Sequence, residues 1–251
     1  MKLARMPDGS PEIFETLQGE GRNTGRPSVF IRASLCNLHC RWCDTDYTWN
    51  WVDTGFEHEK DADPGYEKFQ REDQIVDLDI DEIAEKALAF PAISFVFTGG
   101  EPLIQEKAWV ELMAAISAKR SAAEFEIETN GTLFPGEAFL EGIDQCNVSP
   151  KLANSGVAKE LRYKRDVLHQ FVETEKADFK FVIGNSSDLK EILNIVDSAK
   201  IPAPHVFLMP RARTVAELEA NHSGVAQIAQ EHGFRYSDRL HLRLYGAQRG
   251  T

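Results

Sequence analysis

The chain has 251 residues, of which 42% are hydrophobic and 27% are charged, and its formal net charge is −12. This length and composition allow a core large enough for one α/β domain. The negative charge argues against a protein that binds nucleic acid or an anionic membrane over a broad surface, because such a surface would have to be basic. A small basic pocket for an anionic ligand is still compatible with it.

Residues 1–21 lack the continuous apolar stretch of a secretory signal, and no run approaches the roughly 18 apolar residues that suggest a membrane span. We therefore expect a cytoplasmic protein without a membrane segment. In that reducing compartment, clustered cysteines are expected to bind a metal or take part in redox chemistry rather than form disulfides.

Short apolar runs predict buried β-strands, and longer segments with helical apolar spacing separate most of them. The expected strands cover residues 27–34, 93–97, 124–128, 145–149, 179–183 and 206–209. The expected helices cover 81–90, 105–120, 187–199 and 214–231, and Asp79 or Asp81 is the expected N-cap of the first. This alternation is typical of parallel βαβ units. About six such units predict an open, partial (β/α)6-type barrel with outer helices.

One segment, at about residues 50–77, interrupts this alternation. Residues 51–73 are polar, acidic and rich in turn-forming residues, which indicates a surface insertion. Acidic segments of this kind are usually solvated faces, so we assign this one no binding role. The prediction is one domain over residues 1–251 that carries an acidic insertion.

Chemically distinctive segments follow several of the expected strands. A cysteine-rich loop follows the first, TGGEPL spans 98–103, TNGT spans 129–132, and SPK spans 149–151. Ligands in parallel α/β folds bind at the C-terminal ends of the strands. These segments are therefore expected to meet at one site.

Three of the four cysteines, Cys36, Cys40 and Cys43, lie within eight positions, whereas Cys146 sits in an expected strand and is interpreted as core packing. A disulfide would leave one of the three unpaired. Structural zinc normally needs four ligands, which His39 or Cys146 could complete. An iron–sulfur cubane held by three thiolates would instead keep one iron open for a cofactor.

The spacing CxxxCxxC with Trp42 before the last cysteine, together with Gly-Gly-Glu-Pro at residues 99–102, resembles the radical S-adenosylmethionine (SAM) superfamily. The resemblance implies a [4Fe–4S] cluster whose open iron binds the amino and carboxylate groups of SAM. It also implies that SAM cleavage yields a 5′-deoxyadenosyl radical that attacks the substrate.

Within that superfamily, further stretches resemble the 7-carboxy-7-deazaguanine synthase family. They are EIFETLQGEGRNTGRPSVFIR at 12–32, Asp44-Thr45 followed by DYTW, and the segments TGGEPL, ETNGT, SPK and LHLRLYG. The resemblance implies conversion of 6-carboxy-5,6,7,8-tetrahydropterin to 7-carboxy-7-deazaguanine with loss of ammonia, on the route to queuosine and related deazapurines. It also implies Mg²⁺, a homodimer, and an electron donor such as flavodoxin or ferredoxin.

The same resemblance implies roles for individual residues. The SAM-binding positions are Trp42, Cys43, Asp44, Gly99, Gly100, Glu101, Ser149, Pro150 and Lys151, with Glu128 and Asn130 near the ribose. The substrate-binding positions are Leu17, Gln18, Gly19, Glu20, Arg32 and Thr98. The cluster ligands are Cys36, Cys40 and Cys43, and the Mg²⁺ ligand is Thr45.

Several of these roles have a structural alternative. Arg32 could equally form a strand-end salt bridge, and a His241 near the substrate could equally be structural. Asp44 and Asp46 are chemically stronger magnesium ligands than Thr45, which by itself could be a turn residue. The chain reads Met209-Pro210-Arg211 where the family often has Gln-Pro, which leaves a SAM contact from this segment open.

Two other functions also fit part of the pattern. An activase that installs a glycyl radical on a partner protein would share the cysteines and the Gly-Gly-Glu segment, but would not need the TLQGEG stretch or Thr45. A binding protein stapled by zinc would carry no catalysis, and would contain zinc in place of iron and sulfide.

Overall fold

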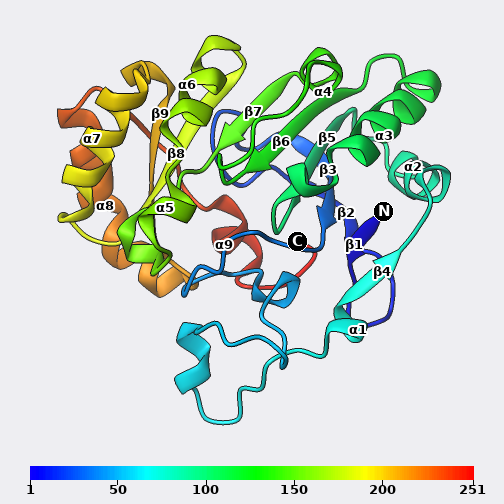
Figure 1. Ribbon diagram of the computed structural model, residues 1–251, viewed down its shortest axis with the longest axis horizontal. Helices are drawn as coiled ribbons and strands as arrows, with labels where there is room; N and C mark the ends of the chain where they lie inside the picture. Colours follow the sequence, from blue (N-terminus) through cyan, green and yellow to red (C-terminus); the bar gives the residue numbers. More distant parts are fainter.

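The computed structural model describes residues 1–251, and its central element is a ten-stranded sheet. The strands run in the order β10-β9-β8-β7-β6-β5-β3-β1-β4, and β2 pairs with β3 beside this path (Figure 1). Their bounds are β1 Lys2–Ala4, β2 Ile13–Leu17, β3 Pro27–Ala33, β4 Ile75–Asp77, β5 Ser94–Gly99, β6 Glu124–Thr129, β7 Gln145–Val148, β8 Ala177–Ile183, β9 Val206–Pro210 and β10 Arg235–Tyr236.

The parallel part of this sheet confirms the predicted strands. Neighbouring strands pair in parallel throughout the series β3, β5, β6, β7, β8, β9 and β10. The pattern did not predict β1, β2 and β4, which pair antiparallel at the β3 edge, nor the two-residue β10. The result is an open α/β barrel with an antiparallel margin.

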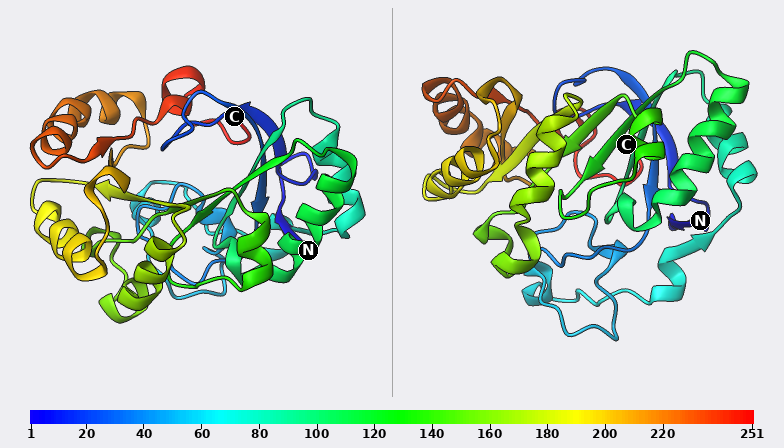
Figure 2. Two further views of the ribbon diagram at one scale, coloured as in Figure 1. Left: turned by 90° about the horizontal axis from the view of Figure 1, so that it is seen from above. Right: turned by 45° about the horizontal axis from the view of Figure 1, so that its top comes forward.

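Most of the helices, though not the C-terminal one, lie around the outside of the curved sheet (Figure 2). Their bounds are α1 Arg71–Gln74, α2 Ile80–Leu88, α3 Glu106–Lys119, α4 Glu137–Gly142, α5 Lys159–Arg162, α6 Arg165–Glu173, α7 Asp188–Ala199, α8 Val215–Glu231 and α9 Leu240–Tyr245. The predicted helices correspond to α2, α3, α7 and α8, and Asp79 caps α2 by accepting a hydrogen bond from the Glu82 amide at 2.8 Å. No helix has both the length and the hydropathy needed to span a bilayer.

Alternation along the strands separates an apolar outer face from a polar inner face. On β6, Phe125 and Ile127 belong to the hydrophobic core, which Trp109 of α3 joins from the helical layer. Phe97 of β5 stacks on Trp109 with 4.4 Å between ring centroids. The carboxylates of Glu126 and Glu128, which alternate with the apolar pair, hydrogen-bond to groups inside the barrel.

The loop between β2 and β3 forms hydrogen bonds with side chains of the parallel strands. Arg22 donates two hydrogen bonds to Asp178 of β8, at 2.6 and 2.7 Å, and Arg26 donates to Glu124 at 2.7 Å. Asn23 donates to Glu126. The β2–β3 loop is thus anchored to strands β6 and β8.

The insertion leaves the sheet after the cysteine loop and returns at α1 and β4; Figure 1 shows it extending away from the sheet. Most side chains at positions 52–65 are exposed, as predicted for a surface segment. Trp51 and His58, however, are buried. The expectation of a solvated face is therefore wrong for the parts of the insertion that pack against the cysteine loop.

Candidate active site

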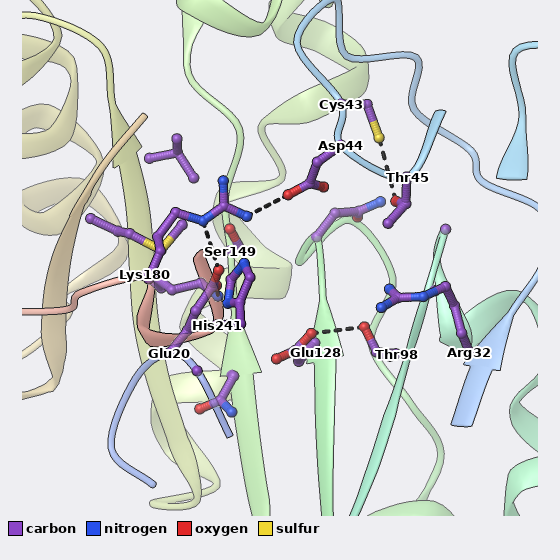
Figure 3. Close-up of a pocket in the computed structure, with 18 of the residues that line it drawn as sticks. Glu20, Arg32, Cys43, Asp44, Thr45, Thr98, Glu128, Ser149, Lys180 and His241 are labelled. Carbon is purple, nitrogen blue, oxygen red and sulfur yellow. Dashed lines mark hydrogen bonds and ion pairs between the residues drawn. The ribbon is translucent and has the colours of Figure 1, made fainter. Parts of the chain in front are cut away.

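A cavity opens at the C-terminal ends of the parallel strands, where the sequence placed the site. Six parallel strands, β3, β5, β6, β7, β8 and β9, contribute lining residues to it. In that order these include Arg32, Thr98, Glu128, Asn147, Val182 and Met209. The cysteine loop covers the same cavity. Figure 3 shows its walls, with Glu20 and Lys180 on one side and Arg32 on the other.

The structure brings nearly all the predicted site residues together around this cavity. Those that line it are Leu17, Gln18, Gly19, Glu20, Arg32, Cys36, Cys40, Trp42, Cys43, Asp44, Thr45, Thr98, Gly99, Gly100, Ser149 and Lys151, with Glu128 and Asn130. Glu101 and Pro150 are buried and do not line it. Their contacts with SAM stay a prediction.

Cys36, Cys40 and Cys43 are free thiols that all line the cavity. Burial raises the pKa of each, in Cys40 to about 12. Cys146 lies in the hydrophobic core, as predicted, so it cannot join them as a fourth ligand. Three thiols and no fourth cysteine are the donor set that a cubane with one open iron requires.

Gly99 and Gly100 allow the strand end to lie directly against the cysteine loop. Gly99 has φ of +141°, and a Cβ there would collide with the Ala33 backbone. A Cβ on Gly100 would collide with the Leu35 carbonyl oxygen, while the Gly100 amide donates to the Ala33 carbonyl at 3.2 Å. The two glycines thus let the end of β5 approach the backbone that leads into the cysteine loop. Both glycines also line the cavity.

Glu101 acts inside the protein rather than at the cavity. Its carboxylate accepts hydrogen bonds from the Asn130 amide at 2.7 Å and from the Thr129 hydroxyl at 2.8 Å. Burial raises the pKa of Glu101, although these hydrogen bonds work in the opposite direction. Glu101 therefore positions Thr129 and Asn130, which themselves line the cavity.

Thr45 differs from its acidic neighbours in what surrounds it. Asp46 is 1% exposed and binds Lys60 at 3.0 Å and the Tyr66 hydroxyl at 2.7 Å, and it does not line the cavity. Asp44 lines the cavity but forms an ion pair with Arg239. The Thr45 hydroxyl lies 3.5 Å from the Cys43 sulfur and carries no ionic partner (Figure 3).

A charge network that sequence analysis missed forms one wall of the cavity. Glu20 pairs with both Lys180 of β8 and Arg239, and Arg239 also pairs with Asp44. Burial would raise the pKa of Glu20, but Lys180 and Arg239 hold it well below its ordinary value. The lysine within the apolar strand FKFVI was a signal for this network, because lysine is rarely buried without a partner.

Arg32 forms the strand-end salt bridge that was its alternative role. Its Nε donates to Glu12 at 2.7 Å, and Arg249 binds the other oxygen of Glu12 at 2.8 Å. Burial would raise the pKa of Glu12, but the two arginines lower it overall. Because Arg32 also lines the cavity, the ion pair does not remove it from reach of a ligand.

Two polar side chains in the middle of the cavity are already hydrogen-bonded. The Thr98 hydroxyl donates to Glu128 at 2.7 Å, and the Gln18 amide donates to Glu126 and, at 3.4 Å, to Glu128. Glu128 has no lysine or arginine within ion-pairing distance, so its carboxylate can accept further N–H groups.

Lys151 is the cation of the cavity that lacks a carboxylate partner. Its Nζ donates to the Ser149 hydroxyl at 3.0 Å and lies 5.8 Å from the centre of the Trp42 ring. The Trp42 indole donates to the Asn154 carbonyl at 3.0 Å, which fixes the ring beside Cys43. This corner of the cavity is suited to a ligand carboxylate.

The C-terminal segment closes the cavity near the β2–β3 loop. Met209 and Arg211 line it, and so does His241. A Cβ on Gly19 would collide with the His241 ring, so only glycine at this position leaves room for the ring. Burial lowers the pKa of His241, which favours the neutral ring.

Known proteins share both the sequence and the fold described above. The family model for the radical SAM superfamily matches residues 31–201. The 7-carboxy-7-deazaguanine synthase of Pyrobaculum aerophilum is 36% identical over 240 residues, which cover 95% of each chain. The chain belongs to the 7-carboxy-7-deazaguanine synthase family. Membership of the radical SAM superfamily implies an iron–sulfur cluster and SAM as its cofactors.

Further members of the family extend the match. The 7-carboxy-7-deazaguanine synthase of Halobacterium salinarum is 34% identical over 257 residues, covering 93% of this chain and 89% of the relative. The crystal structure of QueE from Escherichia coli has a TM-score of 0.61 and 22% identity, and the match covers 96% of this chain and 95% of that one. These similarities confirm the radical SAM barrel and reject the activase and zinc-binding alternatives as the family of this chain.

Proposed function

We propose that this protein converts 6-carboxy-5,6,7,8-tetrahydropterin to 7-carboxy-7-deazaguanine with loss of ammonia. The observation that carries the proposal is the convergence of two sets of residues on one cavity. The cysteine loop supplies three thiols, and the β2–β3 loop supplies Gln18, Gly19 and Glu20. A cavity that holds both sets can bring a reactive cofactor next to a substrate.

In this proposal Cys36, Cys40 and Cys43 would hold the [4Fe–4S] cluster, and residues at the strand ends would bind SAM. When bound, these cofactors supply one-electron chemistry that starts a radical reaction. Lys151 and Ser149 are suited to the carboxylate of SAM, since Lys151 has no competing anion. Asn130, held by Glu101, is suited to the ribose hydroxyls.

The carboxylates that line the cavity are suited to binding a pterin. The pyrimidine edge of a pterin presents several N–H donors, and Glu128 and Glu20 present carboxylate acceptors. The pterin carboxylate needs a cation, for which Arg32 is the candidate at the opposite wall. Fixing the ring at both ends would hold the hydrogen to be removed toward the cofactor side.

We assign Mg²⁺ to Thr45, with the substrate carboxylate and water as its other ligands. Mg²⁺ prefers oxygen ligands and often relies on its substrate for part of its coordination. Both neighbouring carboxylates are engaged elsewhere, Asp46 by Lys60 and Asp44 by Arg239. This arrangement supports Thr45 independently of the family resemblance.

The remaining parts of the proposal concern the setting of the enzyme. We propose that residues 1–251 act as one radical SAM domain, in a cytoplasmic homodimer that serves queuosine or related deazapurine synthesis. An electron-transfer protein such as flavodoxin or ferredoxin is the proposed reductant.

The test is anaerobic turnover of the reconstituted protein with SAM, dithionite, Mg²⁺ and 6-carboxytetrahydropterin, followed by mass analysis. We expect 7-carboxy-7-deazaguanine, with SAM not consumed in proportion. Release of 5′-deoxyadenosine without this product would keep the radical SAM chemistry and overturn the proposed substrate.

A further inference from the structure

The insertion contributes a buried histidine to the back of the cysteine loop. His58 is 3% exposed, and its Nε2 lies 2.9 Å from the carbonyl oxygen of Cys43. Its Nδ1 accepts a hydrogen bond from the Lys60 amide at 3.2 Å. Because Nδ1 is the acceptor, Nε2 carries the proton and donates to the Cys43 carbonyl.

Aromatic packing holds the His58 ring and the cysteine loop together. The His58 ring packs against Trp49, with 6.0 Å between ring centroids, and against Tyr66, with 6.3 Å. Phe56 of the insertion stacks on His39, which lies between two cluster cysteines, at 3.3 Å. The insertion is thus packed against the loop at both His39 and Cys43.

The hydrogen bond fixes the orientation of the Cys43–Asp44 peptide. The chain contains no cis peptide bonds, so the Asp44 N–H points opposite to the Cys43 carbonyl. His58 does not line the cavity, whereas Cys43 and Thr45 do. The Cys43 carbonyl is therefore held by a residue outside the cavity, while the Cys43 sulfur and the Thr45 hydroxyl of the same turn lie 3.5 Å apart.

We propose that His58 is a positioning residue for the iron–sulfur cluster. Its Nε2–H holds the Cys43 carbonyl and thereby fixes the third cysteine as a cluster ligand. The inference rests on the proposed function, because it requires a cluster on the three cysteines. Partners that orient the ligands of a metal site commonly change metal affinity by about 10- to 100-fold, and hydrogen bonds around cluster ligands also set the reduction potential.

Two substitutions separate this role from a merely structural one. His58→Asn keeps an oxygen near the Nδ1 position, which can still accept from the Lys60 amide, but it removes the donor to Cys43. His58→Gln places an amide N–H near the Nε2 position and restores that donor. Both variants lose the aromatic ring equally, so each is the control for the other. His222→Asn, at a half-exposed position of α8, is the remote control.

The measurements are the rate of cluster loss to a chelator under anaerobic conditions and the midpoint potential of the reconstituted protein. We expect His58→Asn to lose its cluster about tenfold faster than wild type. Its midpoint potential should shift away from the wild-type value, because the Cys43 turn is no longer held in one position beside the cluster. His58→Gln and His222→Asn should stay close to wild type.

Equal effects of His58→Asn and His58→Gln would overturn the inference, because His58 would then only support the fold of the insertion. Wild-type behaviour of both variants would overturn it as well. A wild-type protein that takes up no cluster on reconstitution would contradict the proposed function itself, which makes the two failures distinguishable.

Discussion

Among the single residues of the cavity, Thr45 has the most specific proposed role, that of the Mg²⁺ ligand. Replacing it with valine keeps the shape of the side chain and removes the hydroxyl oxygen. We expect Thr45→Val to keep its cluster, because Cys36, Cys40 and Cys43 are unchanged. The Mg²⁺ concentration needed for half-maximal turnover should rise at least about tenfold. Titration of turnover with Mg²⁺ measures this.

Thr45→Ser is the matched control, since it keeps the hydroxyl and should keep the wild-type magnesium response. An unchanged magnesium requirement in Thr45→Val would remove Thr45 as the ligand. Asp44 would then be the next candidate, at the expense of its ion pair with Arg239.

The ion pairs of Glu20 predict how its replacement changes the free energy of unfolding, independently of the cofactors. Glu20→Gln leaves Lys180 and Arg239 without this shared anion, so the free energy of unfolding at pH 7 should fall by about 3 kcal/mol. The pKa of Glu20 is lowered in the folded state, so its stabilising effect is complete above the unfolded value near 4.3. The effect is lost as the pH falls further, toward the lowered pKa of the folded state.

The difference in stability between wild type and Glu20→Gln should therefore be constant from pH 8 to about 5 and shrink below about pH 4. Denaturant unfolding at a series of pH values measures it. A difference that grows on acidification would show that Glu20 does not bear the stabilising negative charge.

At the residue scale, the sequence identified the side chains that belong to a motif and missed those that do not. The three cysteines and Thr45 stand at fixed positions in short contiguous segments. Lys180 and Arg239 are far apart in the chain and meet only because β8 and the segment before α9 converge on Glu20. The lysine within the apolar strand signalled that a partner exists, but no local pattern identifies Glu20 as the partner that Lys180 and Arg239 share.

Among the structural elements, the β2–β3 loop joins the antiparallel margin to the parallel strands. Arg22 binds the buried Asp178 through two hydrogen bonds. Arg22→Leu should therefore cost about 1–3 kcal/mol, because Asp178 loses its bidentate partner. It should also raise the KM for the pterin, since the same loop carries Gln18 and Glu20, while the iron content stays unchanged.

Arg165→Leu is the control for this prediction, because the Arg165 side chain is 57% exposed and its carboxylate partner is 90% exposed. It should change stability by less than about 1 kcal/mol and leave the KM unchanged. An Arg22→Leu protein with wild-type stability and KM would show that the loop is held by other contacts.

Strands and helices with long, periodic patterns were predictable, and short ones were not. β1, β4 and β10 have three residues or fewer, which is too few to display an alternation. β2 is half-buried throughout, so it shows no apolar run. The insertion was predicted from its composition, but the burial of His58 depends on its contact with Cys43 and is invisible in the sequence.

Across the whole molecule, the barrel separates two kinds of cysteine. Cys36, Cys40 and Cys43 face the cavity at the strand ends, while Cys146 faces the hydrophobic core. The order of strands and loops predicted this separation, because the three clustered cysteines follow a strand at the C-terminal edge, whereas Cys146 lies within an apolar strand. The polar interior of the barrel was not predicted, since it is completed by the β2–β3 loop.

The most direct test compares anaerobic product formation by the reconstituted Cys36→Ala and Cys146→Ala proteins with that of wild type. We predict that Cys36→Ala holds less iron and sulfide and forms no 7-carboxy-7-deazaguanine from 6-carboxytetrahydropterin. Cys146→Ala should hold a full cluster and turn over like wild type. Product formation by Cys36→Ala, or a cluster lost from Cys146→Ala alone, would contradict the assignment of the three-cysteine cavity as the active site.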